Sequence, residues 1–333
     1  MALTMALGGR AALASRIILA ALVVLLITLP LWATQSMVNV FLLIMLYMAV
    51  GQMWNLLAGY AGLVSLGQQS FIGLGGYSLA VLTEVYHLHF LLAILVGGVV
   101  SGVFALVISP PIFKMKGIYF AIGTWIIAEA LALYFLNWSF VRYGLGFNIR
   151  TAYDMTTNDL YYLSLVIGLG SVVLVYLIMR TRGGLALMAM RDDEVAAEVM
   201  GIALYKTKLM IFLVSALVTG VAGGVLYLNI SFIQPTAAFS LDWTVAAVVI
   251  VIIGGIGTME GPIVGAVIYV ILQQYLFNFP GFSMIILGVI AISIILVAPR
   301  GIMGTLQEKF GWEVLSPRRN MRKMKALVST DCA

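Results

Sequence analysis

The chain has 333 residues, of which 63% are hydrophobic and only 9% are charged, and its mean hydropathy is +1.11. Soluble domains carry roughly a quarter charged residues, so this composition excludes an ordinary soluble protein. The single cysteine, Cys332, excludes an intramolecular disulfide and a cysteine-based metal site. Strict alternation of polar and apolar residues, typical of membrane β-barrel strands, is absent from the sequence, which therefore predicts an all-α polytopic transmembrane bundle.

Apolar runs follow one another along the chain, many of them near the ~20 residues that cross a bilayer as a helix. The predicted spans, about ten, are Ile17–Trp32, Val38–Leu57, Gly59–Thr83, Leu88–Ile108, Ile118–Leu136, Leu160–Met179, Leu209–Leu228, Trp243–Ile256, Ile263–Leu276 and Ser283–Val297. Spans eight and nine are short and flank a glycine-rich turn, so a re-entrant pair that leaves eight crossings is the alternative. We take residues 1–305 as one transmembrane domain and residues 306–333 as a basic cytoplasmic tail.

The distribution of positive charge orients the chain. With the N-terminus in the cytoplasm, 16 of the 18 lysines and arginines fall on inner segments, and only Arg142 and Arg150 lie outside. Both termini and the central loop, residues 180–208, are then expected in the cytoplasm.

The central loop contains a predicted short helix whose two ends are marked. Asp192, Asp193 and Glu194 place negative charge in its first turn, where the helix dipole favours it. Gly201 stands where a left-handed C-cap is expected. One face of this helix is small and apolar, formed by Val195, Ala196, Val199 and Met200. A helix this short is not stable alone, so we expect its own spans or a partner protein to hold it.

The third predicted span is rich in glycine and in polar residues, among them Ser65, Gln68, Gln69, Ser70 and Tyr77. Such side chains avoid lipid and face the protein interior or a water-filled path. Two interpretations remain open and do not exclude each other. The residues line a substrate pathway, or they form a tight helix–helix seam held by interhelical hydrogen bonds.

Glu129 is the one acidic residue inside an apolar run, and it is therefore a candidate pathway residue. The alternative is that it lies near the outer end of its span, where it caps the helix or pairs with Arg142 or Arg150.

Several enzyme signatures are missing from the sequence. It contains no G-x-x-x-x-G-K-[ST] phosphate loop, no H-E-x-x-H and no G-x-S-x-G motif. We therefore expect no catalytic residues, no cofactor, no metal site and no nucleic-acid partner, and no ATP hydrolysis by this chain itself. An ion-coupled secondary transporter and a polytopic membrane enzyme are the rival classes. The first requires ionisable groups at mid-membrane, and the second requires a polar catalytic cluster.

Several separate motifs together resemble the permease subunits of branched-chain amino-acid ABC importers of the LivM type. They are residues 55–68 (NLLAGYAGLVSLGQ), 116–122 (KGIYFAI) with Glu129, 191–198 (RDDEVAAE) through Gly201, Ile202 and Lys208, 254–258 (GGIGT) with 261–266 (GPIVGA), and 298–301 (APRG). They occur in the order of that family and cover roughly residues 38–305.

The resemblance implies a permease fold like that of type II ABC importers, in a bacterial inner membrane. It implies a second permease subunit, two ABC ATPases that hydrolyse ATP and a periplasmic substrate-binding protein as partners. The cargo is expected to be leucine, isoleucine and valine, with urea or short amides as the alternative. The central-loop helix is similar to an ATPase coupling helix, and its expected coupling residues are Arg191, Asp192, Asp193, Glu194, Ala196, Ala197 and Gly201.

Overall fold

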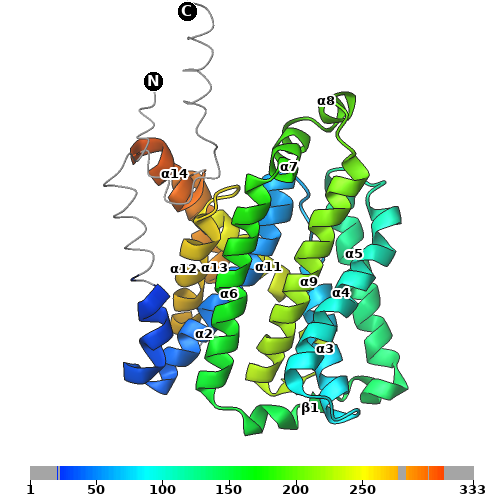
Figure 1. Ribbon diagram of the computed structural model, residues 1–333, viewed down its shortest axis with the longest axis vertical. Helices are drawn as coiled ribbons and strands as arrows, with labels where there is room; N and C mark the ends of the chain where they lie inside the picture. The colour runs from blue at the N-terminus through cyan, green and yellow to red at the C-terminus, as the bar shows by residue number, and fades with distance from the viewer. Residues whose placement is uncertain (1–20, 22, 277–282, 299, 311–333) are drawn as a thin grey trace, which may run out of the picture.

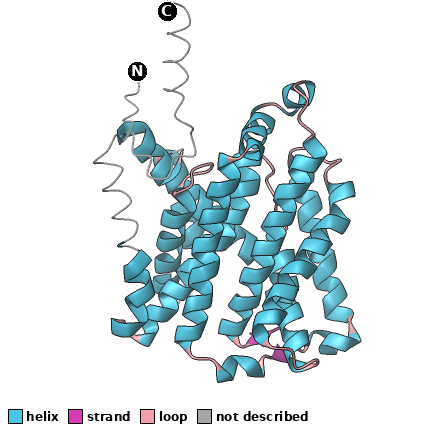
Figure 2. Ribbon diagram, viewed as in Figure 1, coloured by secondary structure: helices cyan, strands magenta, loops and turns pink. Residues whose placement is uncertain are grey.

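The computed structural model describes residues 21, 23–276, 283–298 and 300–310. These residues form a bundle of helices that lie side by side (Figures 1 and 2). Among the described residues, six helical segments are long and apolar enough to cross a membrane: Gln35–Tyr60, Phe90–Ile112, Ile118–Asn137, Thr157–Arg180, Leu204–Ile230 and Pro235–Gly254. The predicted all-α membrane bundle is therefore confirmed.

Several of the predicted membrane spans correspond to helices that are short for a crossing. Val23–Trp32 and Gly261–Leu276 are apolar but shorter, and the helices at the third and last predicted spans have 17 and 15 residues. The count of about ten is not confirmed by these lengths, and the re-entrant alternative remains open. The start of the first predicted span and residues 311–333 of the predicted tail lie outside the described residues.

The long helices are α2 (Gln35–Asn55), α3 (Gln68–Glu84), α4 (Phe90–Ile112), α5 (Ile118–Asn137), α6 (Thr157–Arg180), α9 (Leu204–Ile230), α11 (Asp242–Gly254), α12 (Gly261–Leu276) and α13 (Ser283–Val297). The short ones are α7 (Arg182–Asp192), α8 (Glu194–Val199), α10 (Pro235–Ala238) and α14 (Gly301–Phe310). The π-helical turn η1 (Leu56–Tyr60) and the 3₁₀ turns η2 (Ser139–Gly144) and η3 (Arg150–Asp154) complete the helical elements.

The two ends of the bundle differ. Helices α7, α8 and α14 gather at one end, and β1 lies at the opposite end (Figure 1). There β1 (Phe147–Asn148) pairs antiparallel with β2 (Phe232–Ile233). Helix α14 continues across residue 305, and Gln307 Nε2 donates to Glu260 Oε2 at 3.0 Å. The packed domain therefore includes residues beyond 305.

The third predicted span begins later than the sequence indicated. Residues 56–60 extend α2 as a π-helical turn, the chain then reverses direction, and α3 starts only at Gln68. Gly62 has φ +72, a conformation that favours glycine and that ends the helical path. Trp54 Nε1 donates to Ser65 O at 2.8 Å, which holds the reversed segment against α2. Helix α3 therefore begins inside the bundle, near the level of Trp54.

Glycines allow the central helices to pack closely. A Cβ on Gly75 would collide with the carbonyl of Gly220, and a Cβ on Gly223 would lie 2.5 Å from the carbonyl oxygen of Ile72. Helices α3 and α9 are in extensive contact along this face. This is the close approach of small residues that membrane helices use in place of a hydrophobic driving force.

Candidate coupling and transport site

Of the three acidic residues predicted in its first turn, helix α8 has only Glu194 there. Asp193 is its N-cap, and Asp193 Oδ1 accepts from the backbone N–H of Val195 at 2.8 Å and of Ala196 at 3.1 Å. Gly201 has φ +84 and donates its N–H to Glu198 O at 2.9 Å. The sequence missed α7, however. Asp192 is the last residue of α7 and does not belong to the first turn of α8, because Asp193 is extended and separates the two helices.

The two faces of α8 meet different surroundings. Val195, Val199 and Met200 are 66%, 85% and 69% exposed, and Ala196 is also exposed. Ala197 is fully buried in the cluster that includes Leu187, Met190 and Ile211. Ala197 therefore seats α8 on its own permease, and its role in ATPase coupling stays a prediction.

An ion pair attaches α8 to the next long helix. Lys208 Nζ lies 2.7 Å from Glu194 Oε1, and the Lys208 side chain is only 7% exposed. Glu194 therefore does not face solvent freely. It neutralises a lysine that the start of α9 buries, and a lone buried ammonium would be unfavourable.

Arg191 connects the central loop to two reversals of the chain. We call residues 59–67 and 255–261 the paired breaks. A Cβ built on Gly62 would lie 3.6 Å from Cα of Arg191, and one built on Gly257 would lie 2.8 Å from Arg191 Nη1. Both glycines have positive φ, +72 and +74. One side chain at the end of α7 thus touches a segment of each break.

Side chains of α2 hold the second of the paired breaks, residues 255–261. Asn55 Oδ1 accepts from Gly257 N at 2.8 Å, and Asn55 Nδ2 donates to Thr258 O at 2.9 Å. Gln52 Nε2 donates to Met259 O at 2.8 Å, and Gln52 is fully buried. These bonds satisfy backbone groups that the breaks leave unpaired within the bundle.

Gln68 and Gln69 lie at the start of α3 and are fully buried. Gln68 Nε2 donates to Ser215 Oγ at 3.2 Å, and Gln68 Oε1 accepts from Thr219 Oγ1 at 3.4 Å. Thr244 Oγ1 accepts from the Gln69 backbone N–H and donates to Gln69 Oε1. A polar cluster of α3, α9 and α11 results, with Gln69 Nε2 buried and unpaired among the described residues.

Three of the four remaining residues of the predicted pathway are also buried, and Glu129 is the exception. Ser65 is buried, and its Oγ accepts from Gly67 N at 3.3 Å; Ser70 is also buried. Tyr77 packs between Phe135 and Phe239, at centroid distances of 4.7 and 5.9 Å. Glu129 instead lies on the exposed side of α5, where Trp125 Nε1 donates to its carboxylate at 3.2 Å. The geometry fits a seam, and the pathway role stays a prediction.

Sequence reasoning missed the hydroxyl partners Ser215, Thr219 and Thr244, because single hydroxyls in apolar helices are common. No sequence pattern singles them out. They are identified by the packing of α9 and α11 against α3.

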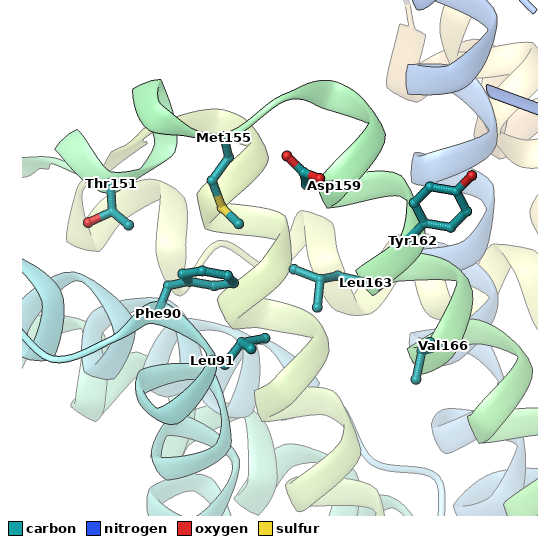
Figure 3. Close-up of a pocket in the computed structure, with 8 residues that line it drawn as sticks. All are labelled: Phe90, Leu91, Thr151, Met155, Asp159, Tyr162, Leu163 and Val166. Atoms are coloured by element: carbon teal, nitrogen blue, oxygen red, sulfur yellow. The ribbon is translucent and has the colours of Figure 1, made fainter. Parts of the chain in front are cut away.

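Figure 3 shows a recess on the bundle, about 650 Å³ in volume, lined mostly by apolar side chains. Two of its polar side chains are already engaged. Asp159 Oδ2 forms a capping box with Thr156, and the Tyr162 hydroxyl donates to Ile27 O at 3.2 Å. Its lining is mostly apolar, with Thr151, Asp159 and Tyr162 as the polar side chains.

A helical bundle with an internal polar cluster, broken helices and a water-exposed loop helix defines a multi-pass membrane protein of transporter type. Residues 36–298 match the family described as "Branched-chain amino acid transport system / permease component", and the chain belongs to this family. The resemblance predicted from the motifs is confirmed.

Known relatives agree with this assignment. The chain is 26% identical to the high-affinity branched-chain amino acid transport system permease protein LivM of Escherichia coli (strain K12), over 86% of this chain and 75% of that protein. It is 28% identical to the probable permease protein LivH of Methanocaldococcus jannaschii, over 51% and 52% of the two chains. A shorter match of 32% identity joins 28% of the chain to the ribose import permease RbsC of Haemophilus influenzae. No solved structure matches the chain.

Proposed function

We propose that this chain is a permease subunit of an ATP-driven importer of leucine, isoleucine and valine in a bacterial inner membrane. A second permease subunit, two ABC ATPases and a substrate-binding protein complete the assembly, and both termini lie in the cytoplasm. Family membership supports this reading, and the relatives are transport permeases. Urea or short amides are the alternative cargo.

The observation that carries the proposal is the exposed apolar face of α8. Val195, Val199 and Met200 are exposed on α8. This helix lies at the end of the bundle that also holds α7 and α14 (Figure 1). Apolar side chains grouped on an exposed surface are typical of a protein contact site. In the proposed assembly this face seats in a groove of a cytoplasmic ATPase, and the buried Ala197 holds the opposite face on the permease.

The route of coupling follows from Arg191. When ATP closes the ATPase pair, α8 and the end of α7 move together, because only Asp193 separates them. Arg191 then displaces Gly62 and Gly257, which it touches. Since these glycines lie in the paired breaks, the displacement reaches the start of α3 and the start of α12.

The test is co-purification of the ATPase with tagged permease. Val199→Glu places a carboxylate in the exposed face, and we expect it to release the ATPase while the permease still inserts. Tyr153→Glu is the matched control, since Tyr153 is 71% exposed in η3, next to β1 at the opposite end. Unchanged ATPase recovery with Val199→Glu, or equal loss with Tyr153→Glu, would remove the support for docking at α8.

A further inference from the structure

A second open recess, about 440 Å³ in volume, lies where α2, α11 and α12 meet. Its lining includes three aromatic rings, one carboxylate and two amides: Tyr47, Trp243, Tyr269, Asp242, Gln234 and Gln273. Tyr47 lies near the middle of the 26-residue run Gln35–Tyr60, so the recess reaches well inside the bundle.

The aromatic wall of the recess is firmly held. The ring of Tyr47 lies 5.2 Å from that of Tyr269 and 6.2 Å from that of Trp243, measured between centroids. Both tyrosines are nearly buried, at 6% and 5% exposure, and Trp243 Nε1 donates to Ala237 O at 2.8 Å. A cation that lies over the free face of one of these rings, within about 6 Å of its centroid, is attracted by that ring.

Asp242 supplies negative charge beside this wall. It is the single acidic residue of the span Pro235–Gly254, and it is exposed. Among the described residues, its carboxylate makes no hydrogen bond and no ion pair. A carboxylate in the first turn of α11 interacts favourably with the helix dipole. That interaction uses no hydrogen bond of the carboxylate, which can still bind a ligand. A carboxylate at this depth is costly against lipid, so it faces water or a cation.

We propose that this recess binds the ammonium group of an amino acid during transport, with Asp242 as its ion-pair partner and Tyr47, Trp243 and Tyr269 as the surrounding aromatic wall. The inference rests on the proposed function and sharpens it. Gln234 and Gln273 carry amide donors suited to the carboxylate of the same ligand. Urea and neutral amides lack the cation, so the recess favours amino acids over them.

The position of the recess also fits transport. Thr244, two residues after Asp242, is bonded to Gln69 in the polar cluster at the start of α3. The recess and the cluster therefore share the first turn of α11. If displacement of the paired breaks moves α3, the shape of the recess and the hydrogen bonds of the polar cluster would therefore change together.

The test uses ligands that separate the charges. Binding of leucine, 3-methylbutylamine and 4-methylpentanoate to the purified full chain is measured by calorimetry and by tryptophan fluorescence. We expect leucine and the amine to bind, and the carboxylate-only analogue to bind at least about tenfold more weakly. Trp243→Phe should weaken the binding of leucine and the amine and reduce the fluorescence change, because it replaces the indole of the aromatic wall by a ring that attracts a cation less strongly. Equal binding of all three ligands, or no binding of leucine and the amine, would overturn the inference.

Two variants at Asp242 complete the test. Asp242→Asn removes the charge with little change in shape and should raise the KM for leucine uptake by the assembled transporter on the order of tenfold or more. Asp242→Glu restores the charge and should recover most of the affinity, which separates a charge effect from misfolding. If the wild-type complex imports leucine and Asp242→Asn has an unchanged KM, the recess inference fails and the proposed function stands. If the wild-type complex imports no branched-chain amino acid, the proposed function fails, and amine binding still tests the recess.

Discussion

Two adjacent alanines in α8 have opposite surroundings, and small size alone did not reveal this. Ala196 is exposed, whereas Ala197 is fully buried. The helical period places neighbours about 100° apart, so they face different sides. From the sequence, either alanine could have been the contact residue. The structure assigns Ala197 to the packing of the permease.

Ala197→Glu should therefore destabilise the permease itself. An unpaired carboxylate in this apolar cluster costs several kcal/mol, on the order of 3–5 for a buried charge without a partner. Ala196→Glu, its matched control, should leave the thermal midpoint of the permease nearly unchanged. Both are measured as thermal unfolding of the detergent-purified chain. Equal midpoints for the two variants would show that Ala197 does not seat α8.

Gln69 offers a test of pathway against seam. Gln69→Leu removes the acceptor of the Thr244 hydroxyl, and a net hydrogen bond is worth about 1 kcal/mol, so the bundle should assemble. If the cluster lies on the transport path, uptake falls more than stability does. Thr244→Val is the companion variant, because it removes the same bond from α11. If Gln69→Leu lowers the yield of assembled complex while each assembled complex transports normally, these residues belong to the seam alone.

At the scale of elements, the sequence predicted α8 well because its signals are local. Both end signals act over a few residues. Gly201 is left-handed where a C-cap was expected, whereas Asp193, expected in the first turn, is the N-cap. The start of α3 could not be predicted in the same way. Hydropathy runs on through residues 59–67, whereas the reversal depends on Gly62 and on a bond from Trp54 to Ser65, eleven positions away.

The link between α7 and the paired breaks is also an element-scale feature, and Arg191 tests it. Arg191→Ala should leave ATPase bound and ATP hydrolysis active while leucine uptake falls, because the contacts with Gly62 and Gly257 are lost. Arg191→Lys should recover only part of the uptake, since an ammonium lacks the planar fork of arginine. Arg182→Ala removes an exposed charge from the start of α7 and serves as the control. Full uptake in Arg191→Ala would contradict this route.

At the scale of the whole molecule, the sequence was enough to predict a membrane protein and its family. It was not enough to predict the number of membrane-spanning helices. Composition alone required a membrane bundle, and the ordered motifs indicated the family. Helices α3, α12 and α13 are too short to be assigned as crossings by length. The hydroxyl partners of Gln68 and Gln69 arrive from helices about 150 and 175 residues away, and only three-dimensional packing brings such groups together.

The central claim is that ATP, and not an ion gradient, drives this chain's transport. The most direct measurement is uptake of labelled leucine by proteoliposomes that hold the full complex, with ATP trapped inside and the binding protein outside. Ionophores collapse proton and sodium gradients throughout. We predict uptake that requires ATP and the binding protein and persists with the ionophores. Uptake that needs no ATP and disappears when the gradients collapse would contradict the account.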